Sequence, residues 1–141
     1  MTDAGLIAKR LARIETCLAD LHLVDPGAIE HDVIRERFVE HTLQIAIQAA
    51  VDVAAHIVAD DHLGDPTTNH GLFDLLHRHG WIPDTLLPAL HRMVGFRNVL
   101  VHAYEDVDVR LVRRVVEFHT GDLLAFVAAM RRRIGPPTPG E

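Results

Sequence analysis

A long segment without a glycine or a proline, residues 28–63, constrains the fold of this chain most strongly. The turn-forming sequences DPG at 25–27 and GDP at 64–66 bound it. Apolar residues recur inside it at helical spacing, and one side of a helix would carry Ile34, Phe38, Ile45, Ala49 and Val53. The segment therefore predicts one long helix whose apolar side packs against other elements.

The rest of the chain also has helical periodicity, and no stretch has the alternation typical of a strand. A first helix is predicted from a stripe with steps of four and three: Ile7, Leu11, Ile14, Leu18 and Leu21. A short helix over about 70–79 has Asn69 as its candidate cap. The next, over about 84–103, tolerates Pro88 near its first turn. A last helix would carry Leu111, Val115, Phe118, Phe126, Met130 and Ile134. These patterns predict an all-α, five-helix, up-and-down antiparallel bundle.

The length of 141 residues suits one domain, predicted over residues 1–134. The sequence GPPTPGE at 135–141 predicts a flexible C-terminal tail. The single Cys17 cannot form an internal disulfide, and the N-terminal residues lack the apolar region of a secretory signal. No stretch reaches the roughly 18 uninterrupted apolar residues of a membrane span. We therefore expect a cytoplasmic protein.

Several functional classes lose support from the composition. The formal net charge of −6 argues against a surface that binds nucleic acid everywhere, although a local basic groove remains compatible with it. Arg131, Arg132 and Arg133 are basic residues near a helix C-terminus, where cations are favoured anyway. The chain has no serine, which excludes a serine nucleophile. Among the 11 histidines, none has the Glu-x-x-His or His-x-x-x-His spacing of metal sites, so no metal site is predicted.

The stretch RNVLVHAY at 97–104 concentrates functional side chains near a predicted helix end. At about 100° per residue, Arg97 and Tyr104 share one face of the helix. Asn98 and His102 are four positions apart, so that one can hydrogen-bond and orient the other. Arg97 and His102 lie about 140° apart around an ideal helix. They meet if the arginine curls back, if the helix distorts, or across a two-fold axis between two subunits.

These side chains offer a fixed cation for phosphate, a group that exchanges protons near neutral pH, and a phenol. Such groups meet the needs of metal-free RNA cleavage, in which a base takes the proton of the ribose 2′-OH and a cation stabilises the phosphorane. The alternative interpretation is that these side chains have a structural role and no catalytic one. Arginine and histidine near a helix C-terminus often bond to its last carbonyls, and tyrosine often packs at the end of a bundle.

A polar stripe within the long helix has the same two interpretations: Gln44, Gln48, Asp52 and His56. It is either the solvent face of the helix or one wall of a cleft. If it faces the helix that carries Arg97, Asp52 is expected to pair with that arginine or to hold His102 in place.

The segment FRNVLVHAYEDVD at 96–108 resembles the Arg-x4-His-x-Tyr signature of HEPN-domain toxins, specifically the HepT-like ribonucleases. Arg97, His102 and Tyr104 occupy the signature positions, and Asn98 is the polar residue after the arginine. The segments LQIAIQAAVDVAAHIVAD and NHGLFDLLHRHGWI resemble the family's second and third helices, so that the likeness covers nearly the whole chain.

The resemblance implies a homodimeric five-helix bundle in which two signature motifs face one shared cleft. It implies the toxin of a type VII HEPN/MNT toxin–antitoxin system, a metal-independent endoribonuclease that needs no cofactor and cleaves cellular RNA such as tRNA. Arg97 and His102 would be catalytic, with Asn98 and Asp52 in support. The partner would be an MNT-type nucleotidyltransferase antitoxin that attaches AMP to Tyr104. The alternative is a non-catalytic HEPN module that serves as a scaffold for the nucleotidyltransferase.

Overall fold

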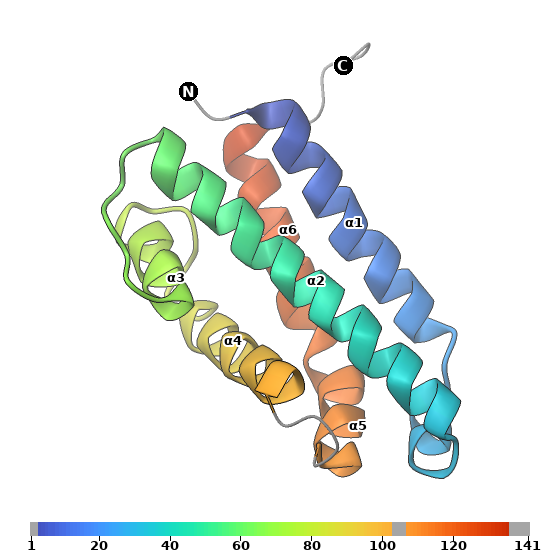
Figure 1. Ribbon diagram of the computed structural model, residues 1–141. Helices are drawn as coiled ribbons and strands as arrows, with labels where there is room; N and C mark the ends of the chain where they lie inside the picture. Colours follow the sequence, from blue (N-terminus) through green and yellow to red (C-terminus); the bar gives the residue numbers. More distant parts are fainter. Residues whose placement is uncertain (1–2, 103–106, 136–141) are drawn as a thin grey trace.

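The computed structural model describes residues 3–102 and 107–135, and all of its regular structure within these ranges is helical (Figure 1). These residues form six α-helices and one 3₁₀ helix: α1 (Ala4–His22), η1 (Pro26–His31), α2 (Val33–Asp60), α3 (Asn69–Arg78), α4 (Leu87–His102), α5 (Val109–Phe118) and α6 (Thr120–Ile134). The prediction of an all-α fold is confirmed, but seven helical elements replace the predicted five. Tyr104 and most of the predicted tail, from residue 136 onward, lie outside the described residues.

The long helices run side by side in alternating directions (Figure 1). α1 leads to η1 at one end of the molecule, and α2 returns along α1 to the other end. After α3, α4 runs back toward the end where η1 lies, and α5 and α6 lead away from it again. α2 is the central helix and contacts every other helical element. α1 and α4 lie on either side of it (Figure 1).

Side-chain caps fix where most of these helices begin. The carboxylate of Asp3 accepts a hydrogen bond from Leu6 N at 3.1 Å, and Asp32 accepts one from Ile34 N at 3.0 Å. Such caps satisfy backbone N–H groups that have no partner within the helix. The cap of α3 is Thr68, whose hydroxyl accepts from Gly71 N at 3.0 Å. The predicted cap, Asn69, is instead the first residue of α3.

The core is one continuous cluster of apolar side chains that includes residues from every helix. Phe73 of α3 and Phe126 of α6 meet edge to face at its centre, with ring centroids 5.8 Å apart and planes at 79°. Both rings are fully buried, and edge-to-face packing brings the positive edge of one ring against the negative face of the other. α2 is long and apolar enough to span a membrane by length and composition, yet 61% of its most apolar window is buried inside the bundle.

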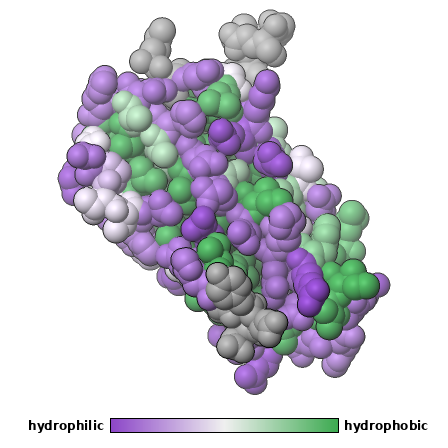
Figure 2. Space-filling view, in the orientation of Figure 1, coloured by the Kyte–Doolittle hydropathy of each residue, from purple (hydrophilic) through white to green (hydrophobic). Residues whose placement is uncertain are grey.

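Several residues on the predicted apolar stripes lie at the surface. Ile34 is 81% exposed and Phe38 is 45% exposed, and Figure 2 shows apolar surface over the beginning of α2. Leu111 and Phe118 of α5 are also exposed. Helical spacing identifies the side chains that share a face, but it does not tell whether another helix covers that face.

The predicted last helix is two helices with a break at His119. Thr120 and Gly121, which are weak helix formers, follow the break. The segment at 25–27 was predicted to end the first helix or to begin a loop. α1 ends before it, at His22, and the segment begins η1 with Asp25 as its cap and Pro26 in its first turn. In the fourth helix the prediction for the proline is confirmed, because Pro88 is the second residue of α4.

Candidate active site

α4 positions the signature residues that the structure describes. Its buried side anchors it to the core through Ala89, Leu90, Met93, Val94 and Phe96. This anchoring places Arg97 and Asn98 at the edge of the packed surface, where both are half-buried, while His102 is the exposed last residue of the helix. Tyr104 follows outside the described residues, so that its predicted role stays a prediction.

Arg97 lines a cleft of about 340 Å³ between α1, α2 and α4. α1 contributes two further arginines, and α2 contributes polar and small residues. The lining residues are Arg10, Arg13, His41, Gln44, Ile45, Gln48, Ala49, Asp52 and Arg97. Three of the four residues of the predicted polar stripe are therefore on the wall of the same cleft as Arg97. The fourth, His56, does not line it.

Asp52 is bound by two neighbours within this cleft. Arg10 Nη1 lies 3.3 Å from Asp52 Oδ2, and Gln48 Nε2 donates a hydrogen bond to Asp52 Oδ1 at 2.9 Å. The sequence led us to expect Arg97 or His102 as the partner of Asp52. Among the described residues the ion pair is made with Arg10 instead, which joins α1 to α2 at the base of the cleft.

Asn98 also has a different partner from the expected one. Its Oδ1 accepts a long hydrogen bond of 3.5 Å from Arg97 Nη1. Within the described residues it makes no hydrogen bond with His102. Asn98 therefore restrains the guanidinium that lines the cleft, while the imidazole at the end of α4 is exposed and makes no hydrogen bond with the residues that the structure describes.

Three buried side-chain atoms of the cleft lack a hydrogen-bond partner within the described part of the chain: Arg10 Nε, Gln48 Oε1 and Arg97 Nε. Buried polar groups are usually paired, because an unpaired one costs about 1–3 kcal/mol. A polar group bound in the cleft is one way to supply the missing partners. The cleft is therefore the candidate site for the group that Arg97 binds.

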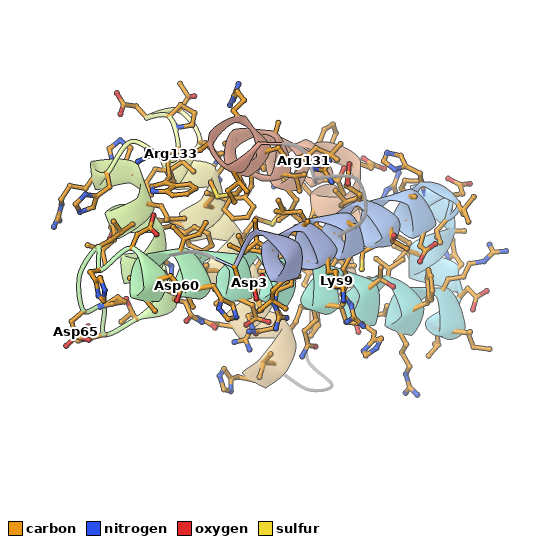
Figure 3. The ribbon with its side chains drawn as sticks, turned by 90° about the horizontal axis from the view of Figure 1, so that it is seen from above. Asp3, Lys9, Asp60, Asp65, Arg131 and Arg133 are labelled. Carbon is orange, nitrogen blue, oxygen red and sulfur yellow. The ribbon has the colours of Figure 1, made fainter. Side chains whose placement is uncertain are left out.

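The arginine cluster near the C-terminus has no part in this cleft. Figure 3 labels Arg131 and Arg133 on α6, across α1 and α2 from the end of α4. Arg131 forms an ion pair with Glu15, and Arg133 donates to His79 O at 2.9 Å and covers the ring of Trp81. These two arginines hold α6 against α1 and against the residues after α3. This agrees with the interpretation that the cluster is a helix-end feature.

Within residues 3–102 and 107–135, no group of three or more histidine, cysteine, aspartate or glutamate side chains is arranged to hold a metal ion. The described site instead offers guanidinium groups inside a cleft and an exposed imidazole nearby. A guanidinium binds phosphate through paired N–H donors, and an imidazole accepts or releases a proton near neutral pH. This chemistry suits a phosphodiester substrate.

Comparison with known proteins decides the family. A model of the family described as Ribonuclease HepT-like matches residues 7–130. The chain belongs to the HepT-like ribonuclease family. The match covers α1 to most of α6 and includes every described residue of the candidate site.

Two HepT nucleases are similar to this chain in sequence. The mRNA nuclease HepT of Shewanella oneidensis is 30% identical over 128 residues, which cover 89% of this chain and 96% of that protein. The tRNA nuclease HepT of Aphanizomenon flos-aquae is 30% identical over 114 residues, which cover 81% of this chain and 73% of that protein.

Solved structures of toxin–antitoxin complexes are similar in fold. The tri-AMPylated HEPN toxin of Shewanella oneidensis, solved in complex with the MNT antitoxin, has a TM-score of 0.85 at 30% identity and covers 94% of this chain and 99% of its own. A toxin–antitoxin solved with AMP-PNP has a TM-score of 0.85 at 28% identity. The bundle described above is thus the fold of HEPN toxins.

The sequence did not point to the α1 side of this site. Arg10 and Asp52 are 42 positions apart, and no short motif connects them. Arg10 and Arg13 are one helical turn apart on α1, beside the apolar stripe that includes Leu11 and Ile14. That spacing is common on solvent-exposed helix faces, and it becomes informative only when α1 and α4 are placed on either side of α2, at one cleft.

Proposed function

We propose that this chain is the toxin of a type VII HEPN/MNT toxin–antitoxin system and acts as a metal-independent endoribonuclease on cellular RNA. The observation that carries the proposal is the intact signature, Arg97, His102 and Tyr104, in a HepT-like chain whose Arg97 lines a basic cleft. The two similar nucleases act on mRNA and on tRNA by name. Cellular RNA is therefore the substrate class, and tRNA is the first substrate to test.

In the proposed reaction, His102 takes the proton from a ribose 2′-OH, and the 2′ oxygen attacks the adjacent phosphorus. The bond from phosphorus to the 5′ oxygen of the next nucleotide breaks, that oxygen takes a proton from water, and His102 releases to solvent the proton that it accepted. The products are a 2′,3′-cyclic phosphate and a free 5′-OH. Arg97 stabilises the charge on the phosphorane. Asn98 restrains the guanidinium of Arg97 by accepting a hydrogen bond from Arg97 Nη1.

A homodimer is part of this proposal. Arg97 points into the cleft between α1 and α2, whereas His102 is exposed at the end of α4 and does not line that cleft. A two-fold axis near the end of α4 would bring the histidine of one subunit toward the arginine of its partner. The two signature motifs would then share one substrate-binding cleft.

We also propose that an MNT-type nucleotidyltransferase in the same cytoplasm controls the toxin by attaching AMP to Tyr104. The related toxin of Shewanella oneidensis is tri-AMPylated and was solved with its MNT antitoxin, which supports a partner of this kind. A nucleotide attached two residues after His102 would bring a phosphate to the end of α4. Its negative charge and its bulk would compete with RNA for the same arginine.

The experiment that tests this function compares wild type with His102→Ala and Arg97→Ala. Expression of wild type without the antitoxin is expected to arrest growth, and the purified protein is expected to cleave RNA. Loss of the general base is expected to lower the rate by about 10²- to 10⁴-fold, and loss of the cation by about 10²- to 10³-fold. Helical circular dichroism should be unchanged, since His102 is exposed and Arg97 is at the edge of the core.

The alternative is a non-catalytic HEPN module that serves as a scaffold for the nucleotidyltransferase. A scaffold needs neither the arginine nor the histidine of the signature. Growth arrest that persists in both variants, with no RNA cleavage by purified wild type, would favour the scaffold and contradict the proposed enzyme.

A further inference from the structure

The cleft beside Arg97 carries more positive charge than one catalytic arginine supplies. Three guanidinium groups, those of Arg10, Arg13 and Arg97, share its lining with one carboxylate, that of Asp52. Arg10 and Gln48 already bind that carboxylate. The cleft is therefore basic in a chain whose formal net charge is −6, and the local field attracts an anion that the whole molecule would repel.

Arg13 differs from the other two arginines of this cleft in its contacts within the described residues. Its side chain is exposed, and it forms no ion pair or hydrogen bond with any other residue that the structure describes. Arg10 lies one turn before it on α1, half-buried, with its position fixed by Asp52. The two side chains thus line the wall of the cleft that α1 provides, on the other side of the polar stripe of α2 from Arg97.

The geometry points to a second phosphate-binding position: we propose that Arg13, beside the ion pair of Arg10 with Asp52, binds a phosphate of single-stranded RNA that flanks the scissile phosphate at Arg97. This inference rests on the proposed ribonuclease function. RNA is a continuous polyanion, so that a strand whose scissile phosphate lies at Arg97 must place its neighbouring phosphates within one nucleotide of it. Basic grooves that follow the backbone are the usual way to hold single-stranded nucleic acid.

Asp52 has a defined part in this arrangement. A free carboxylate on the cleft wall would repel a phosphate, and it would also compete with that phosphate for the guanidinium of Arg97. The ion pair of 3.3 Å with Arg10 neutralises it, and the hydrogen bond of 2.9 Å from Gln48 holds its other oxygen. Arg97 and Arg13 are thereby left available for the RNA backbone.

The test measures RNA binding in the His102→Ala background, where the probe is not cut. The probe is a fluorescein-labelled single-stranded RNA of about a dozen nucleotides, and the Kd is measured by fluorescence anisotropy over a series of salt concentrations. Adding Arg13→Ala is expected to weaken binding by about 5- to 10-fold at about 0.1 M salt. It is also expected to reduce the slope of log K against log[salt] by about 0.7, because one phosphate contact is lost.

Arg78→Ala is the matched control, because Arg78 is an exposed arginine on α3 that does not line the cleft and makes no ion pair within the described residues. It removes the same charge and is expected to leave both Kd and slope unchanged. Arg13→Lys is expected to retain the slope, since the charge remains. The proposal would be overturned if Arg13→Ala had the same Kd and salt slope as the His102→Ala parent. It would also be overturned if Arg78→Ala weakened RNA binding as much as Arg13→Ala does.

Cleavage by wild type, measured in parallel, separates this inference from the function on which it rests. If wild type cleaves RNA and Arg13→Ala binds as its parent does, the flanking position is wrong and the ribonuclease stands. If wild type does not cleave but Arg13 still contributes to the salt slope, the cleft binds RNA and the proposed reaction is wrong. Absence of RNA binding by the parent even at low salt would overturn the inference.

Discussion

The ion pair between Arg10 and Asp52 allows a quantitative test of how the cleft is built. Its charged atoms are 3.3 Å apart, and the two side chains are 33% and 36% exposed. Coulomb's law at that separation gives about 5 kcal/mol for an effective dielectric constant of about 20, and about 1.3 kcal/mol for bulk water. Because both groups are about one-third exposed and lose side-chain entropy when they pair, we expect a net coupling of about 1 kcal/mol.

A double-mutant cycle measures this coupling through the free energy of unfolding in urea. The variants of the first cycle are Arg10→Ala, Asp52→Ala and the double mutant. A second cycle combines Asp52→Ala with Arg97→Ala in the same way. We expect a coupling of about 1 kcal/mol in the first cycle and less than about 0.3 kcal/mol in the second, since among the described residues Asp52 pairs with Arg10 and not with Arg97. The opposite order of the two couplings would refute our description of the cleft and restore the partner expected from the sequence.

Three further predictions concern other parts of the chain. Tyr104→Phe should remain toxic when the antitoxin is co-expressed, and intact mass should show no added AMP; neutralisation by modification of the variant would contradict the switch. Burial, reinforced by the nearby Glu36, raises the pKa of Glu40 to about 7, so that wild type loses stability as the pH rises from about 4.5 through 7. Glu40→Gln should therefore leave the urea midpoint unchanged near pH 4 and raise the free energy of unfolding by up to about 1 kcal/mol at pH 8, a figure that is reduced because Glu40 is partly exposed. Equal effects at both pH values would be inconsistent with the raised pKa. Phe126→Ala should lose about 3–5 kcal/mol of stability, which urea unfolding measures, because its ring is fully buried against Phe73; a loss below about 1 kcal/mol would argue against that packing.

The sequence was sufficient for the helical class and for the places where several helices begin and end. The repeat of three and four from Ile7 to Leu21 places these residues on one face of α1, and all of them are buried because α2 and α6 pack against that helix. The exposure of Ile34 and Phe38 was not predictable, since their spacing is also helical and only the position of neighbouring helices leaves them uncovered. The break at His119 was not predicted either, because Thr120 and Gly121 after it are weak helix formers that also occur inside continuous helices.

The candidate site likewise has one part that the sequence predicted and one part that depends on how the helices pack. Arg97, Asn98 and His102 could be named as candidates from the sequence because one motif contains them. The α1 wall with Arg10 was missed, because its contact with Asp52 joins residues 42 positions apart and depends on how α1 packs on α2. The polar stripe on α2 left two interpretations open, and only the position of α4 distinguishes a cleft wall from a solvent face.

The measurement that tests the central claim most directly is the chemistry of the RNA ends that the purified protein produces in EDTA. We predict that wild type cleaves RNA under these conditions and leaves 2′,3′-cyclic phosphate or 3′-phosphate ends with free 5′-OH groups. DNA of the same sequence should stay intact, and His102→Ala should be inactive while it keeps its helical spectrum. Ends with 5′-phosphate and 3′-OH, cleavage that requires an added divalent cation, or undiminished cleavage by His102→Ala would contradict the account.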